Sequence, residues 1–428
     1  MTRGKRDGPG RRAVPLAVLF ALTGALGAQV PEDQVLSERV LSPQAEIDQA
    51  IAESRFHLGP VRLSPEVSIR DVTYDNNVYG TSESPRGDFR ATVSAGLGLI
   101  LPVASNVFLR AGISPAYTWY AELKERRFFG GSTSASFLVF ANRLTLEGAA
   151  GAAKEDVIFS SEAQGRVIRN LGTIRLSAEL RLFARLYLYG SGAIQRFRFT
   201  GPGAEGAIFD PSQTDRMDQS VRAELRYRLS EDVRVAAGYE ETRAEFVSTP
   251  QQYDNRTRTV VGTIYYDRQS FFLHASGGYS DQKPINGSTV PTFSGLTGSS
   301  FASYALLSRL DVLAFANRGV SYGLASPYYI ATRYGGGVVF KVGWRLKLQG
   351  SASLGSDRYT TPVSSARQVV DRKDDIKSYG GGFDFLFSPR IQMKFIATES
   401  RYTSNVPGND RSFFRFFGTL SYGGNLLR

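Results

Sequence analysis

Apolar and polar residues alternate along most of the chain after residue 60. From Phe89 to Leu99 every second residue is apolar, and Arg90, Thr92 and Ser94 are among the residues between them. Side chains of a β-strand point alternately to its two faces, so this pattern predicts a strand with one apolar face. A second alternating run, from residue 107 to 114, follows after the short segment "PVASN". The two runs predict a β-hairpin with a tight turn.

The same hairpin pattern recurs to the end of the sequence. Its further copies are "VFANRLTLEGAA", "LRLFARLYLYGSG", "RLSEDVRVAAG", "YYDRQSFFLHASGG", "AFANRGVSYG", "VFKVGWRLKLQGSAS" and "FLFSPRIQMKFIA". We count about eight tight turns, a regular spacing that indicates one closed array of strands. Longer polar connections separate the hairpins: Asp75 to Gly87, Lys154 to Arg166, Gly201 to Arg216, Asp281 to Ser299 and Asp357 to Lys377.

This alternation of tight turns with long connections predicts an all-β fold, a transmembrane antiparallel β-barrel. All tight turns then lie at the periplasmic end and all long loops at the other end. The eight hairpins, the run that starts at Val61 and the final segment "RSFFRFFGTLSYGG" give about 18 strands, with about 16 as the alternative. A secreted β-sandwich, propeller or β-helix would need longer apolar runs or a second packed layer.

The first 27 residues have the parts of a secretory signal peptide. Five basic residues precede a mostly apolar run from Ala13 to Ala25, and Ala25-Leu26-Gly27 supplies small residues at the cleavage positions. We therefore predict a signal peptide at residues 1–27 and export of the chain. A transmembrane anchor would need roughly 20 apolar residues, and this run is shorter and contains Pro15.

Residues 28–60 form a lead segment before the alternation starts. Ile47 and Ile51 lie four positions apart, Ser42 and Pro43 suit the start of a helix, and Gly59-Pro60 suits its end. The segment predicts a short periplasmic helix. A plug, a partner-binding helix and a poorly ordered tail are open alternatives. Residues 61–428 are then the barrel.

Composition supports one β-rich unit. The chain has 44 glycines, 21 tyrosines and 28 phenylalanines, but 3 methionines and no cysteine. Aromatic residues suit pleated strands and glycine suits tight bends. Without cysteine the chain has neither disulfides nor thiolate metal sites. The formal net charge is +11, and it stays at +7 after loss of the signal peptide.

If the apolar face meets lipid, the polar face of the same strands lines the interior. The residues that the alternation places there are Arg90, Arg110, Arg175, Glu179, Arg181, Arg222, Glu224, Arg226, Arg228, Arg234, Lys347 and Lys394. Ten bases stand against two acids in this set. A cationic ring in a narrow low-dielectric pore enriches anions and disfavours cations. These residues are therefore predicted to line an anion-preferring pore.

Wall bracing is the alternative role for the same charges. Barrel interiors are polar in general, and arginine–glutamate ladders can hold neighbouring strands together through charge-assisted hydrogen bonds. Glu179 with Arg181 and Glu224 with Arg226 are spaced for such contacts. Bracing and anion selectivity both follow from a polar lumen, and the sequence leaves both open.

Aromatic residues near the loop ends predict a girdle at the lipid interface, with sugar stacking as a minor alternative. They are Tyr117, Trp119, Tyr120, Tyr239, Tyr279, Tyr328, Tyr329 and Tyr359.

Other candidate chemistry is weak. No nucleophile motif accompanies the two histidines, His57 and His274, so we predict no enzyme and no catalytic residue. Asp75-Asn76-Asn77 and Asp371 with Asp374-Asp375 could offer oxygen ligands to calcium, but solvated loop acids are the default interpretation. We therefore predict no metal and no cofactor. The chain is basic without an aromatic-basic surface, which argues against a nucleic-acid partner.

The segment "LSPEVSIRDVTYDNNVYG" follows the helical lead and opens the series of hairpins. In this arrangement it resembles the outer-membrane β-barrel porin family often linked with exopolysaccharide loci of Gram-negative bacteria. The resemblance covers residues 61 to 428 in pattern, with Pro65 and the segment from Tyr74 to Tyr79 as its motif-like parts. It implies polysaccharide secretion or passive diffusion.

Three functions are therefore open. The first is a conduit for export of an acidic exopolysaccharide across the Gram-negative outer membrane, because guanidinium groups pair with carboxylates in a forked geometry. Its partners would be outer-membrane lipid, the polysaccharide and periplasmic polysaccharide-export proteins. The second is a general or anion-selective diffusion porin. The third is a structural or adhesive barrel without transport.

Overall fold

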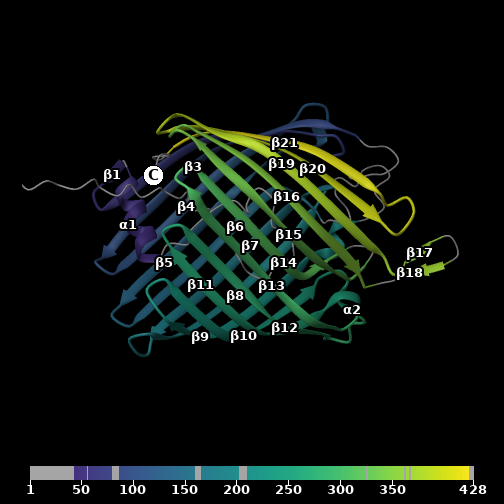
Figure 1. Ribbon diagram of the computed structural model, residues 1–428, viewed down its shortest axis with the longest axis horizontal. Helices are drawn as coiled ribbons and strands as arrows, with labels where there is room; N and C mark the ends of the chain where they lie inside the picture. The colour runs from purple at the N-terminus through teal and green to yellow at the C-terminus, as the bar shows by residue number, and fades with distance from the viewer. Residues whose placement is uncertain are drawn as a thin grey trace, which may run out of the picture.

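Eighteen strands close into one antiparallel barrel in the computed structural model (Figure 1). The structure describes residues 43–54, 56–79, 86–159, 165–201, 210–323, 326–360, 363–365 and 368–423. The barrel strands are β2 (Val61–Asp75), β3 (Asp88–Ala104), β4 (Val107–Tyr120), β5 (Phe128–Ala141), β6 (Leu144–Ile158), β7 (Arg166–Arg181), β8 (Leu186–Thr200), β9 (Arg216–Arg228), β10 (Val233–Phe246), β11 (Asn255–Arg268), β12 (Phe271–Pro284), β13 (Phe293–Leu307), β14 (Leu310–Tyr322), β15 (Tyr328–Val342), β16 (Leu346–Tyr359), β19 (Lys373–Ser388), β20 (Ile391–Ser404) and β21 (Arg411–Tyr422).

The remaining elements are short. They are α1 (Pro43–Glu53), β1 (Phe56–Leu58), the 3-10 helices η1 (Lys124–Arg126) and η2 (Pro211–Thr214), α2 (Pro250–Tyr253), and the hairpin of β17 (Val363–Ser365) with β18 (Gln368–Val370). Among the described residues, no helix combines the length and the hydropathy needed to cross a membrane.

The barrel closes between its first and last strands. β2 pairs with β3 on one side and with β21 on the other, where Ser68 lies opposite Ser421. Closure leaves no unpaired strand edge, which is the condition for a sheet to span lipid. The predicted all-β barrel of about 18 strands is confirmed.

The outer face of the wall is apolar. On β7, β11 and β12 the side chains of Ile174, Val260 and Tyr279 are 62%, 67% and 56% exposed. The residues between such positions point inward, where hydroxyls pair across strands, as Thr259 with Ser280 at 2.8 Å. An apolar exterior on a closed barrel is the arrangement of an integral outer-membrane protein.

Tight turns and long connections lie at opposite ends of the barrel, with α1 at the tight-turn end and β17–β18 at the long-loop end (Figure 1). One predicted turn is wrong. All but the last residue of the segment "AFANRGVSYG" lie within β14, and the turn falls at Ser308-Arg309. The predicted connection from Asp281 to Ser299 is also too long, because β12 and β13 extend into it and pair as Gln282 with Phe293. The sequence did not predict that β12 and β13 extend this far, because the residues at these strand ends are polar.

The helix predicted in the lead segment is present as α1. Its Ile47 is fully buried against Phe108 of β4 and Leu138 of β5, with Ile51 packed beside them. Because Phe108 and Leu138 point inward near the tight turns, α1 is docked on the inner wall at that mouth. The chain then forms β1, which pairs with the start of β2.

Parts of the predicted organisation lie outside the described residues. These are the signal peptide at residues 1–27, the first part of the lead segment and the last five residues of the chain. Their boundaries stay predictions.

Candidate functional site on the inner face of the barrel

The strand register divides the predicted polar residues into separate groups. On β9, Val221 and Leu225 are exposed on the outer face, so Arg222, Glu224 and Arg226 alternate with them on the inner face. The other predicted residues follow the same parity on their own strands. They lie at different heights along the barrel axis and have different interaction partners, so they do not form one continuous ring.

A central network of ion pairs joins β7, β9 and β10. Glu224 accepts from Arg222 Nε at 2.7 Å and from Arg226 Nε at 2.8 Å. Arg222 Nη1 lies 3.3 Å from Glu240, and Arg226 Nη1 lies 2.7 Å from Glu179. Arg222 therefore bridges carboxylates on the adjacent strands β9 and β10, and Arg226 bridges carboxylates on β9 and β7, which lie on either side of β8.

Aromatic rings complete the central network. The Arg226 guanidinium lies 3.6 Å from the centre of the Tyr189 ring, and Arg175 Nη2 donates to the Tyr189 hydroxyl at 3.2 Å. His274 lies nearby, with its ring 4.4 Å from that of Tyr265. With Glu179, Glu224 and Glu240 against Arg175, Arg222 and Arg226, this part of the wall is neutral.

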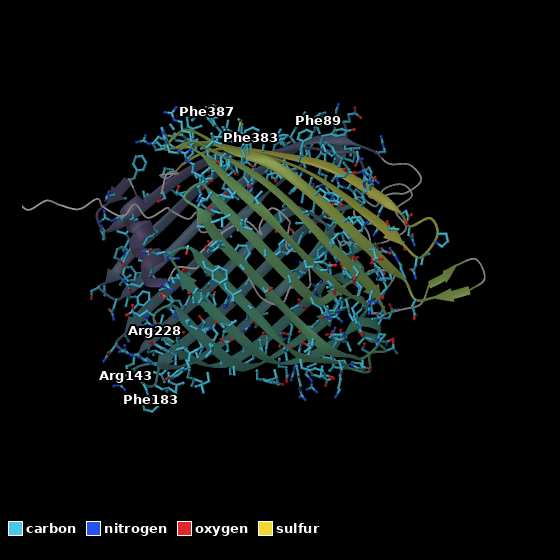
Figure 2. The ribbon with its side chains drawn as sticks, viewed as in Figure 1. Phe89, Arg143, Phe183, Arg228, Phe383 and Phe387 are labelled. Carbon is cyan, nitrogen blue, oxygen red and sulfur yellow. The ribbon has the colours of Figure 1, made fainter. Side chains whose placement is uncertain are left out.

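A second group lies at the tight-turn rim. Arg228 and Arg234 are directly opposite each other in the register of β9 and β10. Neither makes an ion pair with a carboxylate in the described part of the chain, although Glu231 and Asp232 lie in the turn between them. Arg181 Nη2 donates to the carbonyl of Asn142 at 3.5 Å. Figure 2 shows Arg228 at this end of the barrel, together with Arg143 and Phe183.

The remaining predicted bases lie elsewhere on the inner face. Lys347, Asp384 and Lys394 follow one another across β16, β19 and β20, so one carboxylate stands between two ammonium groups. Arg110 of β4 lies opposite Ser136 of β5.

The long-loop mouth holds a buried ionic cluster, here called the mouth network. Asp75 accepts from Arg166 Nε at 3.2 Å and from Arg415 Nε at 3.1 Å. Asp156 lies 3.5 Å from Arg90 Nη1 and 3.8 Å from Arg126 Nη2, and the Tyr120 hydroxyl donates to it. The ion-paired side chains are less than one-tenth exposed.

The mouth network crosses between distant parts of the wall. Asp75 ends β2 and Arg166 begins β7, with β3 to β6 between them in the sheet. The connection after β2 also contacts the start of β7, since the Arg166 amide donates to the carbonyl of Val78 at 3.0 Å. Tyr79 in this connection donates to Glu125 at 3.0 Å. The pKa of Tyr79 is raised, mainly by burial and secondly by this hydrogen bond.

A similar contact crosses the opposite side of this mouth. The guanidinium of Arg216, on β9, lies between the rings of Phe197 and Tyr322, at 4.4 Å and 4.8 Å. Tyr322 belongs to β14, and its ring also meets Phe246 of β10 edge-on at 5.2 Å. Strands β11 to β13 lie between β10 and β14. Side chains therefore narrow the long-loop mouth from two sides.

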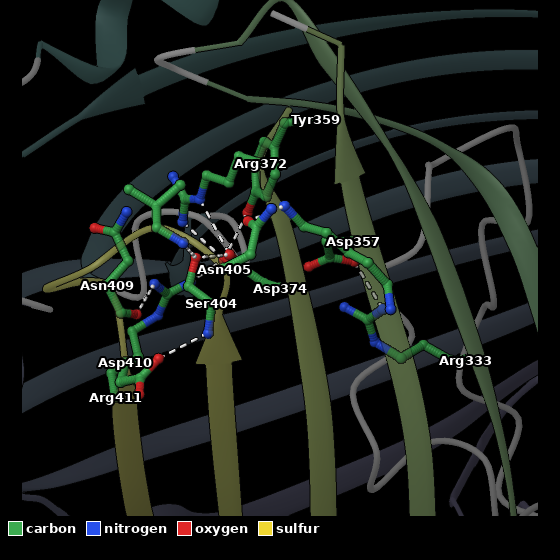
Figure 3. Close-up of polar contacts among 12 residues, drawn as sticks. Arg333, Asp357, Tyr359, Arg372, Asp374, Ser404, Asn405, Asn409, Asp410 and Arg411 are labelled. Carbon is green, nitrogen blue, oxygen red and sulfur yellow. Dashed lines mark hydrogen bonds and ion pairs between the residues drawn. The ribbon is translucent and has the colours of Figure 1, made fainter. Parts of the chain in front are cut away.

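Figure 3 shows a third group at the long-loop mouth. Asp374 accepts from Arg372 Nη2 at 2.7 Å and from the Ser404 hydroxyl at 2.6 Å, and Arg411 lies 3.3 Å away. Arg333 pairs with Asp357 at 2.7 Å.

Two of the acids considered as calcium ligands have arginine partners, whereas Asp375 is exposed beside Lys373. Asp75 and Asp374 are both buried in ion pairs, so they are not the solvated loop acids expected from the sequence. Among the described residues there is no group of three or more acids and histidines placed to hold a metal ion.

The aromatic girdle is smaller than predicted. Trp119, Tyr239 and Tyr279 are exposed on the outer face. Four of the predicted girdle residues are instead buried at the long-loop mouth, so they do not face lipid. These are Tyr120, Tyr328, Tyr329 and Tyr359.

Most of the mouth residues were missed by sequence reasoning. Only Arg90 was assigned to the inner face, whereas Asp156, Arg126, Arg166 and Arg415 were not. Asp156 and Arg166 lie near the facing ends of β6 and β7, and Arg126 lies in η1, outside any strand. The sequence signal that could have indicated the mouth network is an acid at the last position of a strand, such as Asp75.

The fold is that of known outer-membrane porins. No protein-family model matches the sequence, and no curated protein matches it. A BenF-like porin from Pseudomonas fluorescens Pf-5 superposes with a TM-score of 0.50 at 11% identity, covering 85% of this chain and 99% of its own. The outer membrane protein opdK from Pseudomonas aeruginosa has a TM-score of 0.50 at 10% identity, with 84% and 98% covered. With its apolar exterior, the chain is an outer-membrane β-barrel of porin-like fold.

Proposed function

We propose that this barrel is a diffusion passage for small anionic solutes. The observation that carries the proposal is the pair Arg228 and Arg234, which lie opposite each other without a carboxylate partner in the described part of the chain. Like charges directly opposite in a sheet repel, so an anion between them is favoured. Arginine stays charged at any cellular pH and offers a forked donor set to a carboxylate.

The central network supports a different role for Arg222 and Arg226. Both guanidiniums are engaged by glutamates of the wall, so little of their field is free to attract a solute. Their contribution is bracing between β7, β9 and β10. Anion preference is therefore assigned to the tight-turn rim and not to the central network.

Export of an acidic exopolysaccharide would use the same arginine rim. The crossing contacts at the other mouth favour the small solute instead. A polymer would have to separate Asp75 from Arg166 and Arg216 from Tyr322, whereas a small anion needs less room. Swelling of liposomes that contain the barrel, measured with uronic acid oligomers of increasing length, separates the two functions. Entry of monomers alone supports diffusion, and equal entry of long oligomers supports export.

Replacing Arg228 and Arg234 together by glutamine should lower the anion-over-cation permeability ratio to roughly half. The measurement is the reversal potential in planar bilayers under a salt gradient. The matched control is Arg309→Gln with Arg390→Gln, which removes the same charge from exposed tight turns at this end of the barrel. An unchanged ratio in the Arg228/Arg234 variant, with normal insertion, would remove the arginine rim as the source of selectivity. Absence of any conductance in the unchanged protein would favour a structural or adhesive barrel.

A further inference from the structure

Cations also gather on the outer face, at the long-loop ends of β10, β11 and β12. The register places Arg243 opposite Arg256, and Arg256 opposite Lys283. All three share the parity of the exposed Val260 and Tyr279, so they point away from the barrel. Arg243 and Lys283 are 50% and 61% exposed. Three cations thus stand side by side in one row on the outside of the wall.

The next row toward the membrane centre only partly compensates them. It contains Glu241, Arg258 and Asp281. Glu241 lies 3.3 Å from Arg243 and 3.1 Å from Arg258, and Asp281 lies 2.9 Å from Lys283. Four cations therefore share two carboxylates, and Arg256 makes no ion pair within the described residues. Glu245, one row further out on β10, is paired with none of them in that part of the chain.

The third row is apolar and aromatic. Tyr239, Val260, Tyr279 and Leu296 follow one another across β10 to β13, and all four are exposed. Tyrosines of this kind mark the boundary between hydrocarbon and headgroups. The rows of charge beyond them lie at the level of lipid headgroups. In outer-membrane barrels the long loops face outward, so this is the outer leaflet.

We propose that Arg243, Arg256, Arg258 and Lys283, here called the rim patch, bind the phosphate groups of a phosphorylated glycolipid in the outer leaflet. Like charges placed directly opposite destabilise a sheet unless an anion stands between them. Arginine matches phosphate with two parallel hydrogen bonds, and the exposed tyrosines and Leu296 below would meet the acyl chains. This site lies on the outside of the wall and is independent of what passes through the lumen.

The same arrangement recurs on the far side of the barrel. Arg358 lies opposite Lys373, and Lys377 lies opposite Arg401, across β16, β19 and β20. Asp375 is 2.7 Å from Lys373, and Glu399 is 2.7 Å from Arg401. Four cations again share two carboxylates on the outer face. The repetition indicates that excess positive charge is a feature of this rim.

The test measures binding of bisphosphorylated lipid A to the purified barrel in detergent, by native mass spectrometry and titration. Arg256→Gln with Lys283→Gln should weaken binding about tenfold, as expected for the loss of two exposed ion pairs of up to about 1 kcal/mol each. Arg309→Gln with Arg390→Gln, in tight turns at the opposite rim, should leave the affinity unchanged. Heat-modified mobility on a gel shows whether each variant is folded.

Two further probes identify the bound chemistry. The unchanged barrel should bind dephosphorylated lipid A no more tightly than the Arg256/Lys283 variant binds lipid A, because this lipid has lost its negatively charged phosphates. Inorganic phosphate at millimolar concentration should not displace lipid A, since it lacks the acyl chains. Equal binding of phosphorylated and dephosphorylated lipid, equal affinity of the folded variant, or displacement by phosphate alone would each overturn the proposal.

Discussion

Replacing Asp156 by alanine is expected to lower the free energy of unfolding by about 3–5 kcal/mol, because it leaves buried guanidiniums without their partner. Asp156 lies within 3.9 Å of Arg90, Arg126 and Arg166, and its side chain is 2% exposed. The desolvation of these arginines is offset only while the carboxylate is present. Equilibrium unfolding in urea with lipid vesicles measures the change.

Asp375→Ala is the matched control for Asp156→Ala. This carboxylate pairs with Lys373 at 2.7 Å, but its side chain is 57% exposed. Exposed ion pairs contribute about 0–1 kcal/mol. If both variants lose the same small amount, the mouth network is not a stabilising element of the barrel.

Ile174→Arg should destabilise the barrel by about 2–4 kcal/mol, the cost of a cation on the lipid face near the bilayer midplane. Ile174 lies in the middle of β7 on the outer face and stands opposite Ile194 of β8. The same unfolding measurement applies. Ser276→Arg adds the same group to the inner face of β12 and should cost only about 1 kcal/mol, the hydrogen bond with Thr263 being lost. Equal losses at both positions would contradict the assignment of faces.

The strand pattern was predictable from the sequence because a half-buried wall imposes a period of two. The segment from Phe89 to Leu99 alternates as predicted and lies within β3. Strand ends were less predictable. Asp281 and Gln282 are polar and read as loop, yet they are paired with Ser294 and Phe293 in the sheet. Outside the hydrocarbon layer, a polar residue costs nothing on either face, and the pattern no longer marks the strand.

The inner-face residues were predictable by parity, but their roles were not. The sequence placed Arg222, Glu224 and Arg226 on one face, as the register has them. The sequence did not show that Glu240 contacts Arg222, because that contact depends on the register between β9 and β10. An arginine-rich strand therefore looked like a cationic ring, whereas Glu179 of β7, Glu224 of β9 itself and Glu240 of β10 neutralise its centre.

The mouth network depends on contacts that no local pattern contains. Asp75 and Arg166 are separated by 91 positions in the chain and by four strands in the sheet. They meet because the connection after β2 folds toward the interior, as Val78 shows by packing against Tyr120 and Leu123. Alternation within a strand fixes its face, but it gives no information on what lies across the barrel.

The reversal potential of single channels formed by the unchanged protein, under a potassium chloride gradient, tests the proposed passage most directly. The sign is expected to show that chloride is more permeant than potassium, because the tight-turn rim carries Arg228 and Arg234 opposite each other and the central network is neutral. A reversal potential of the opposite sign, or membranes that contain folded barrel and conduct no ions, would contradict an anion-preferring passage.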